Sequence, residues 1–223
     1  MLVAAAVCPH PPMLVPEIAQ GAAAELDDLR DACDAVVAGL LDARPERVVV
    51  VASGGEERGW PGDARPDFAP YGVSAATDGR RSLRGSLGLS MGAWLLDRAG
   101  VVLPREYSQV TGRAAATGHT RTALLVMADG TAKRSTQAPG YLDERAEAFD
   151  ADIAKALAAG DAEALERLDP AVGEELWVRG IPALHTLGAT FRAQGGTVPA
   201  ARLLYDAAPY GVGYFVALWR RSE

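Results

Sequence analysis

A histidine stands in a proline-rich stretch, CPHPPMLVP at residues 8–16, where an apolar run ends. Prolines fix the backbone φ angle, so His10 is held on a stiff loop. A neutral imidazole can bind a metal ion or accept a proton, and both roles benefit from a fixed position. The alternative role is structural, with the ring nitrogens bonded to backbone groups of the turn. The local sequence leaves both interpretations open.

Three further side chains that could do chemistry follow apolar runs. Asp129 ends the run 122–129, and Lys133 stands in the polar loop after it. Glu56 comes shortly after the run 47–53. Carboxylates bind metal ions or carry protons, and an amine can also carry a proton. Asp129 could equally cap a turn, and Glu56 could equally be solvated, so both alternatives stay open.

The remaining histidines and the cysteines carry weaker indications. His119 precedes an apolar run and is expected to be exposed, while His185 lies inside a helical pattern and is expected to be packed. Cys33 is expected in the core. Cys8 either packs at the end of the first apolar run or supplies a thiolate near a metal ion. Two cysteines are too few for a disulfide scaffold or a cysteine-based zinc site.

The residues that position these groups alternate between strand and helix patterns. Short apolar runs without breakers predict buried strands, and apolar residues at helical spacing predict helices. The expected strands are 1–8, 47–53, 105–112 (an edge strand), 122–129, 199–206 and 213–219; the expected helices are 17–43, about 88–99, 141–160, 161–169, 170–180 and 181–196. Residues 54–86, rich in Gly, Pro, Asp and Arg, predict a long irregular loop.

Together these elements predict one α/β domain over residues 1–223, with a mostly parallel, partly mixed central sheet flanked by helices. Ligands of such sheets bind beyond the carboxyl ends of the strands. The loops at 8–17, 53–86 and 129–140 leave those ends. A binding or catalytic site is therefore expected where these three loops meet.

Composition and charge disfavour several classes of partner. A net charge of −7 argues against nucleic acid and against an anionic membrane surface. No window approaches the ~20 apolar residues of a membrane span, and no export signal is recognisable, so a cytoplasmic protein is expected. The stretch SGGEERGW lacks the spacing of a phosphate-binding loop, and no serine stands in a nucleophile-elbow pattern.

Three stretches resemble one enzyme family. CPHPPMLVPEI, ALLVMADGTAKRSTQAPGYLDERAEAFDADIAKALAAGDAEALERLD and APYGVGYFVALW are similar to parts of the class III extradiol ring-cleavage dioxygenase family, which includes the Memo-like proteins. The resemblance implies a phosphorylase/hydrolase-like fold. It also implies an Fe(II) ion held by two histidines and a carboxylate, with open positions for a catecholate and O₂ and a histidine base nearby.

The family's functional residues carry over only in part. The first iron ligand falls on His10. The turn expected to hold the second histidine has none and offers Glu56 instead. Lys133 stands near the place of the histidine base, and the carboxylate ligand falls on Asp206 or Glu17. Fe(II) is the cofactor that the family implies, and the missing histidines argue against it in this chain.

Three functions are therefore open. We expect a homologue that has lost iron and ring cleavage and acts as a binding or assembly protein, with a small aromatic ligand and self-association as candidate interactions. The second interpretation is a catechol dioxygenase whose metal site is rebuilt from His10, Glu56 and Asp206, or from Asp129. The third is a non-redox enzyme or small-molecule binder using the same crevice. Lys133 and Asp129 are the candidate catalytic residues.

Overall fold

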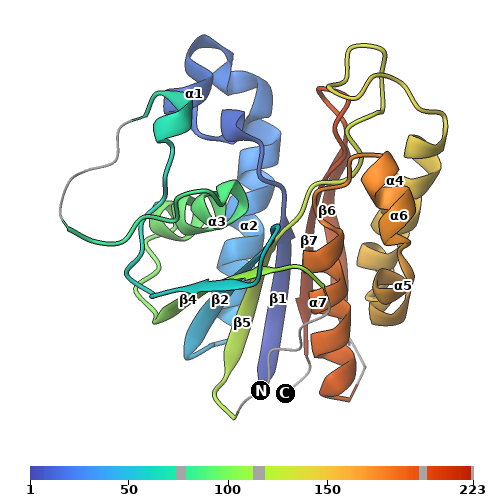
Figure 1. Ribbon diagram of the computed structural model, residues 1–223. Helices are drawn as coiled ribbons and strands as arrows, with labels where there is room; N and C mark the ends of the chain where they lie inside the picture. The colour runs from blue at the N-terminus through green and yellow to red at the C-terminus, as the bar shows by residue number, and fades with distance from the viewer. Residues whose placement is uncertain (74–78, 113–118, 196–199, 222–223) are drawn as a thin grey trace.

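The strands of the protein form one mixed sheet in the order β3-β4-β2-β5-β1-β7-β6 (Figure 1). The computed structural model describes residues 1–73, 79–112, 119–195 and 200–221. The central strands β1, β5, β2 and β4 are parallel, and β3, β7 and β6 add antiparallel pairings on the two sides. The strands are β1 (Leu2–Cys8), β2 (Arg47–Ser53), β3 (Arg58–Trp60), β4 (Arg105–Val110), β5 (Thr122–Met127), β6 (Ala200–Ala207) and β7 (Tyr214–Arg220). The expected single α/β domain is confirmed.

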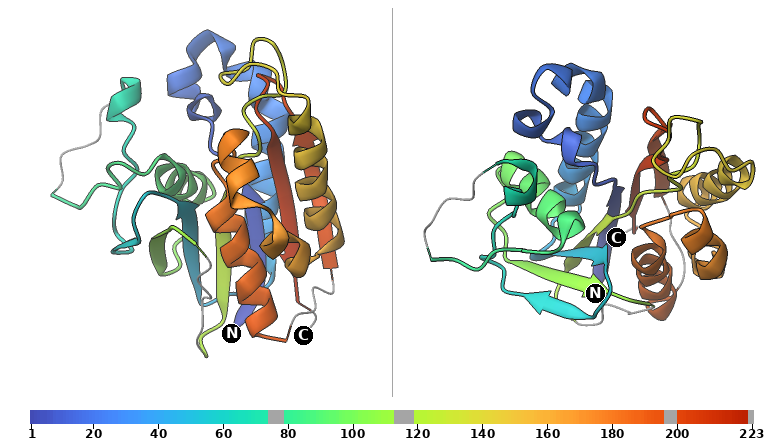
Figure 2. Two further views of the ribbon diagram at one scale, coloured as in Figure 1. Left: turned by 45° about the vertical axis from the view of Figure 1, so that its right-hand side comes forward. Right: turned by 45° about the horizontal axis from the view of Figure 1, so that its top comes forward.

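Helices cover both faces of this sheet, as the two views of Figure 2 show. One face carries α2 and α3, and the other carries α4, α5 and α7, with α6 beside them. The helices are α1 (Pro16–Ala19), α2 (Asp27–Asp42), α3 (Leu87–Arg98), α4 (Arg145–Ala159), α5 (Ala162–Arg167), α6 (Pro170–Glu175) and α7 (Ile181–Ala193). None of them, within the described residues, is both long enough and apolar enough to span a bilayer.

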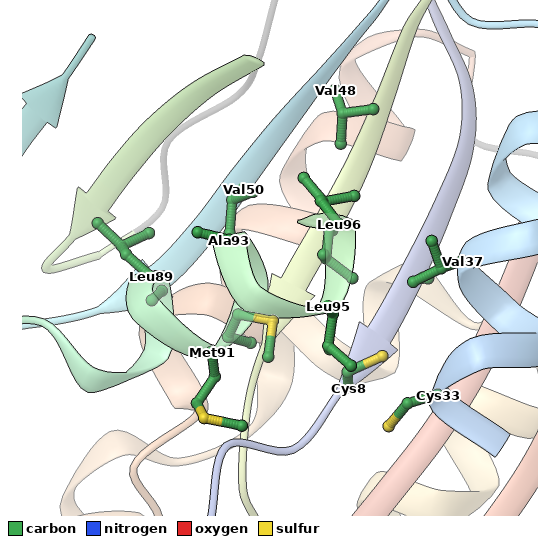
Figure 3. Packing of buried hydrophobic residues seen from close by; sticks show 14 of the residues in the cluster. Cys8, Cys33, Val37, Val48, Val50, Leu89, Met91, Ala93, Leu95 and Leu96 are labelled. Carbon is green, nitrogen blue, oxygen red and sulfur yellow. The ribbon is translucent and has the colours of Figure 1, made fainter. Parts of the chain in front are cut away.

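Alternating side chains of the central strands feed two separate cores. In β1, Cys8 belongs to the core on the α2 and α3 side, whereas Val7 belongs to the core on the α4 and α7 side. Neighbouring residues of a strand point to opposite faces, so a strand covered on both sides must be apolar throughout. Figure 3 shows the first of these cores, in which Cys8 of β1 and Cys33 of α2 lie close to each other. The predicted core position of Cys33 is confirmed.

Two expected helices begin later than the sequence pattern predicts. The helix expected over 17–43 is divided into α1, a 3-10 segment over Gln20–Leu26 and α2. Gln20 adopts a positive φ of 51°, which no continuous α-helix allows. The helix expected over 141–160 begins only at Arg145, because Tyr141 also has a positive φ of 60°. The Gly160 C-cap of that helix adopts the left-handed conformation.

The stretch 54–86 is more ordered than expected in its first part. Residues Arg58–Trp60 form β3, which pairs antiparallel with β4. The strand expected over 105–112 is therefore not an edge strand, since β3 covers its outer side. Trp60 is buried against the core, and that burial stabilises a strand too short to show periodicity. Residues 74–78 of this stretch, and residues 196 and 199 at expected element ends, lie outside the described residues.

Candidate functional site

The carboxyl ends of the parallel strands open a fork in the sheet. β1 lies between β5 and β7 and ends at Cys8. Beyond that point, the chain after β5 pairs directly with the chain leading into β7. Asp129 forms an isolated bridge with Tyr214, and the Gly130 amide donates to the Gly213 carbonyl at 2.7 Å. The loop that carries His10 leaves β1 at this fork, where the ligand crevice is expected.

His10 and Asp129, which are 119 residues apart in the sequence, meet in the fork. The His10 amide donates to Asp129 Oδ1 at 2.8 Å, and Nδ1 of the imidazole lies 3.4 Å from the same oxygen. Each side chain keeps 13% of its surface exposed. The carboxylate thus caps the proline-rich loop and also faces the ring. Both alternatives left open for Asp129, a cap and a group of the site, are combined in one contact.

The imidazole of His10 is oriented but not fully satisfied. Its Nδ1 is buried and has no hydrogen-bond partner among the described residues, since 3.4 Å is longer than a well-formed hydrogen bond. With Nδ1 directed at a carboxylate, the proton of the neutral ring belongs on that nitrogen. Nε2 is then the atom that can accept a proton or a hydrogen bond from a ligand.

The first turn of α3 closes one side of the site. Gly88 lies so near the sheet that a Cβ atom there would come within 2.7 Å of the Ala52 Cβ and 3.9 Å of the His10 Cδ2. Ser86 caps this helix, and its Oγ accepts from the Leu89 amide at 3.5 Å. The absence of a side chain at Gly88 therefore lets the positive end of α3 approach the imidazole.

Tyr214 belongs to the site, although no feature of the sequence singled it out. Its stretch, DAAPYGVGYF, has the character of a tight turn between strands, which gave no signal for a functional tyrosine. The residue is 4% exposed. Burial and then the nearby charge of Asp129 raise the pKa of Tyr214 well above its ordinary value. The phenol therefore stays protonated and can serve as a hydrogen-bond donor.

Asp150 on α4 supports the fork from behind and was likewise not predicted as a site residue. Its carboxylate accepts from the Thr131 amide at 2.8 Å, the Thr131 hydroxyl at 2.9 Å and the Arg134 guanidinium at 3.1 Å. Burial raises the pKa of Asp150, and these three donors act in the opposite direction. The only sequence signal was its place in the AFD segment of the family resemblance.

The other predicted site residues lie elsewhere. Lys133 directs its ammonium to the Trp177 ring, 5.7 Å from the ring centre. The Glu56 side chain is 73% exposed and lies 3.9 Å from Arg58. Asp206 is exposed on β6 and pairs with Phe215, whose ring belongs to the core on the α4 and α7 side. Paired residues share a face, so Asp206 points away from the face that carries α3.

The donors around His10 do not fit the iron site of the family. That site needs two histidines and a carboxylate on one face of the ion. The fork supplies His10 and Asp129, whereas Glu56 and Asp206 stay apart from them. Across the described parts of the chain, no three His, Cys, Asp or Glu side chains gather closely enough to hold a metal ion. We therefore derive no chemical step through iron.

The secondary candidates have structural positions. His119 is exposed, and His185 is buried with Nε2 3.0 Å from the Leu168 carbonyl oxygen, as expected for both. Cys8 is a buried free thiol. Burial and the neighbouring Cys33 raise the pKa of the Cys8 thiol well above its ordinary value, which favours the packing interpretation over a thiolate. Glu17 is exposed on α1.

The chain matches no protein-family model, and no curated protein matches it significantly. The resemblance to the extradiol dioxygenases therefore rests on the motif residues alone. The fork geometry, and not a relative, has to carry the functional argument.

Proposed function

We propose that the protein is an extradiol-dioxygenase-like homologue that binds a small hydroxylated aromatic molecule at the fork without using iron. The observation that carries the proposal is the His10–Asp129 pair, partly exposed at the carboxyl ends of β1 and β5. A histidine oriented by a carboxylate is a good acceptor for a ligand hydroxyl. Tyr214 adds a protonated phenol beside the same carboxylate.

The residues of the fork would divide the work of recognition. Asp129 holds the His10 loop and directs Nδ1, so Nε2 accepts a hydrogen bond from the ligand hydroxyl. The first turn of α3 favours partial negative charge on the ligand oxygen, because the positive end of the helix dipole lies there. Replacing His10 removes a hydrogen bond to a polarised group, which costs about tenfold or more in affinity.

The proposal is tested by calorimetric titration of metal-stripped protein with catechol, phenol and benzene. Catechol or phenol is expected to bind and benzene to bind much more weakly. His10→Ala is expected to weaken binding of the hydroxylated ligands, and His119→Ala, a change at an exposed histidine, is the matched control. Equal affinity of the His10→Ala variant and the unchanged protein would contradict the proposal.

A second candidate function is acid–base catalysis at the same fork without a redox metal. The 3.4 Å approach of Nδ1 to Asp129 favours it, because the same arrangement lets Nε2 remove a proton and the carboxylate stabilise the resulting imidazolium. The two candidates differ in turnover. A binder returns the ligand unchanged after prolonged incubation, whereas an enzyme converts it at a rate that Asp129→Asn lowers.

The remaining expectations accompany this proposal. Assembly into homo-oligomers is measured by light scattering of the purified protein. A cytoplasmic location fits the two cysteines, since both are free thiols as in a reducing compartment. The rebuilt metal site of His10, Glu56 and Asp206 would require these side chains to move together, and stoichiometric Fe(II) binding abolished by Glu56→Gln would support it.

A further inference from the structure

Asp150 is the most deeply buried carboxylate in contact with the loop that forms the fork. It is 1% exposed, on the face of α4 that meets the sheet. Its three donors, described above, all belong to residues Thr131 and Arg134 of the loop after β5. Burying a carboxylate is costly unless such donors compensate, so a site of this kind fixes the loop strongly.

The same carboxylate also touches the two glycines that zip the fork together. A Cβ atom at Gly130 or at Gly213 would overlap the Asp150 carboxylate. These glycines are joined by the 2.7 Å hydrogen bond that closes the fork, and the Gly213 amide donates to the Thr131 carbonyl at 2.8 Å. Asp150 therefore contacts both sides of the fork at its narrowest point.

The contacted glycines are direct neighbours of the groups proposed to bind ligand. Gly130 follows Asp129, and Gly213 precedes Tyr214. From these contacts we infer that Asp150 is a positioning residue: it fixes the Asp129–Tyr214 bridge and thereby the carboxylate that orients His10. The inference rests on the proposed function for its importance to ligand binding, but its structural part can be measured without any ligand.

The charge and shape of Asp150 are both required for this role. An asparagine has one acceptor oxygen, and its amide group would face donors of Thr131 and Arg134. Asp150→Asn therefore keeps the size of the side chain but leaves at least one buried donor unpaired. The exposed Asp152 on the same helix provides the matched control, Asp152→Asn.

The experiment combines amide hydrogen exchange with ligand titration. In Asp150→Asn we expect the His10 amide, which donates to Asp129, to exchange roughly tenfold faster than in the unchanged protein. We also expect affinity for catechol to fall by about tenfold. Amides of the helix α2 and the Asp152→Asn variant should show neither change.

The outcomes separate this inference from the proposed function. A folded Asp150→Asn variant with unchanged His10 exchange overturns the positioning role, even if its unfolding free energy falls. If catechol does not bind the unchanged protein, the proposed function fails, while His10 exchange still decides the role of Asp150. If Asp150→Asn does not fold, Thr131→Val, which removes the 2.9 Å hydroxyl bond, is judged by the same two results.

Discussion

Gly92 offers the sharpest test of how α3 is held against the sheet. A Cβ atom at this position would lie well under 3.0 Å from a methyl group of Val50 and 3.2 Å from the Met127 sulfur. Val50 is fully buried on the central strand β2, and its branched side chain has no alternative place to go. Overpacking of such a core costs about 1–3 kcal/mol. Alanine in a helix regains about 1 kcal/mol over glycine, so Gly92→Ala should lose roughly 1–2 kcal/mol.

A second glycine makes the comparison internal. Gly39 of α2 also lies close to the sheet, but its added methyl would meet the far end of the flexible Leu218 side chain. Leu218 can rotate away, and the gain in helix propensity offsets the cost, so Gly39→Ala should change the unfolding free energy by less than about 1 kcal/mol.

Urea unfolding with an unchanged denaturant slope measures both variants. For a chain of this length, Gly92→Ala should lower Tm by roughly 2–8 °C. A Gly92→Ala variant as stable as the unchanged protein, or less affected than Gly39→Ala, would refute the packing argument.

Three further predictions concern other parts of the molecule. Paired with Arg145, the Asp143 carboxyl has its pKa lowered to about 2, so the stability it contributes is present above about 3.8 and is lost as pH falls toward 2; Arg145→Gln should flatten this acid limb in pH-dependent unfolding, and an unchanged limb would contradict the pairing. Trp219→Phe removes the indole donor of the 2.7 Å bond to the buried Leu157 carbonyl and should cost about 1–3 kcal/mol in urea unfolding, whereas a neutral result would mean that the carbonyl is satisfied otherwise. Cys8 should resist iodoacetamide at pH 8 in the folded protein and react after unfolding, followed by mass spectrometry; rapid labelling in the folded state would contradict its burial.

Periodicity in the sequence predicts the central strands because both of their faces are buried. β1, β2 and β5 are short apolar runs without breakers, and the structure places them at the middle of the sheet. β3 escapes such a prediction because three residues cannot show a period, and only pairing with β4 makes them a strand. The division of the first helix follows from the positive φ of Gln20, which the alanine-rich sequence around it does not indicate.

The candidate site divides in the same way. The rule that ligands bind beyond the carboxyl ends of parallel strands places His10 and Asp129 in one region, and the structure brings them into contact. Glu56 follows a strand that neighbours β5, but its chain turns outward to form β3. Tyr214 and Asp150 act through contacts with residues far away in the sequence, so no local pattern could identify them.

The central claim is that the fork recognises its ligand through His10 and Asp129 without iron. The most direct measurement is an anaerobic titration of the purified protein with catechol, carried out once on metal-stripped protein and once after reconstitution with Fe(II), with bound iron quantified. We predict the same catechol affinity in both samples and its loss in the His10→Ala variant. Catechol binding that appears only with one bound iron per chain, together with oxygen uptake, would contradict the account.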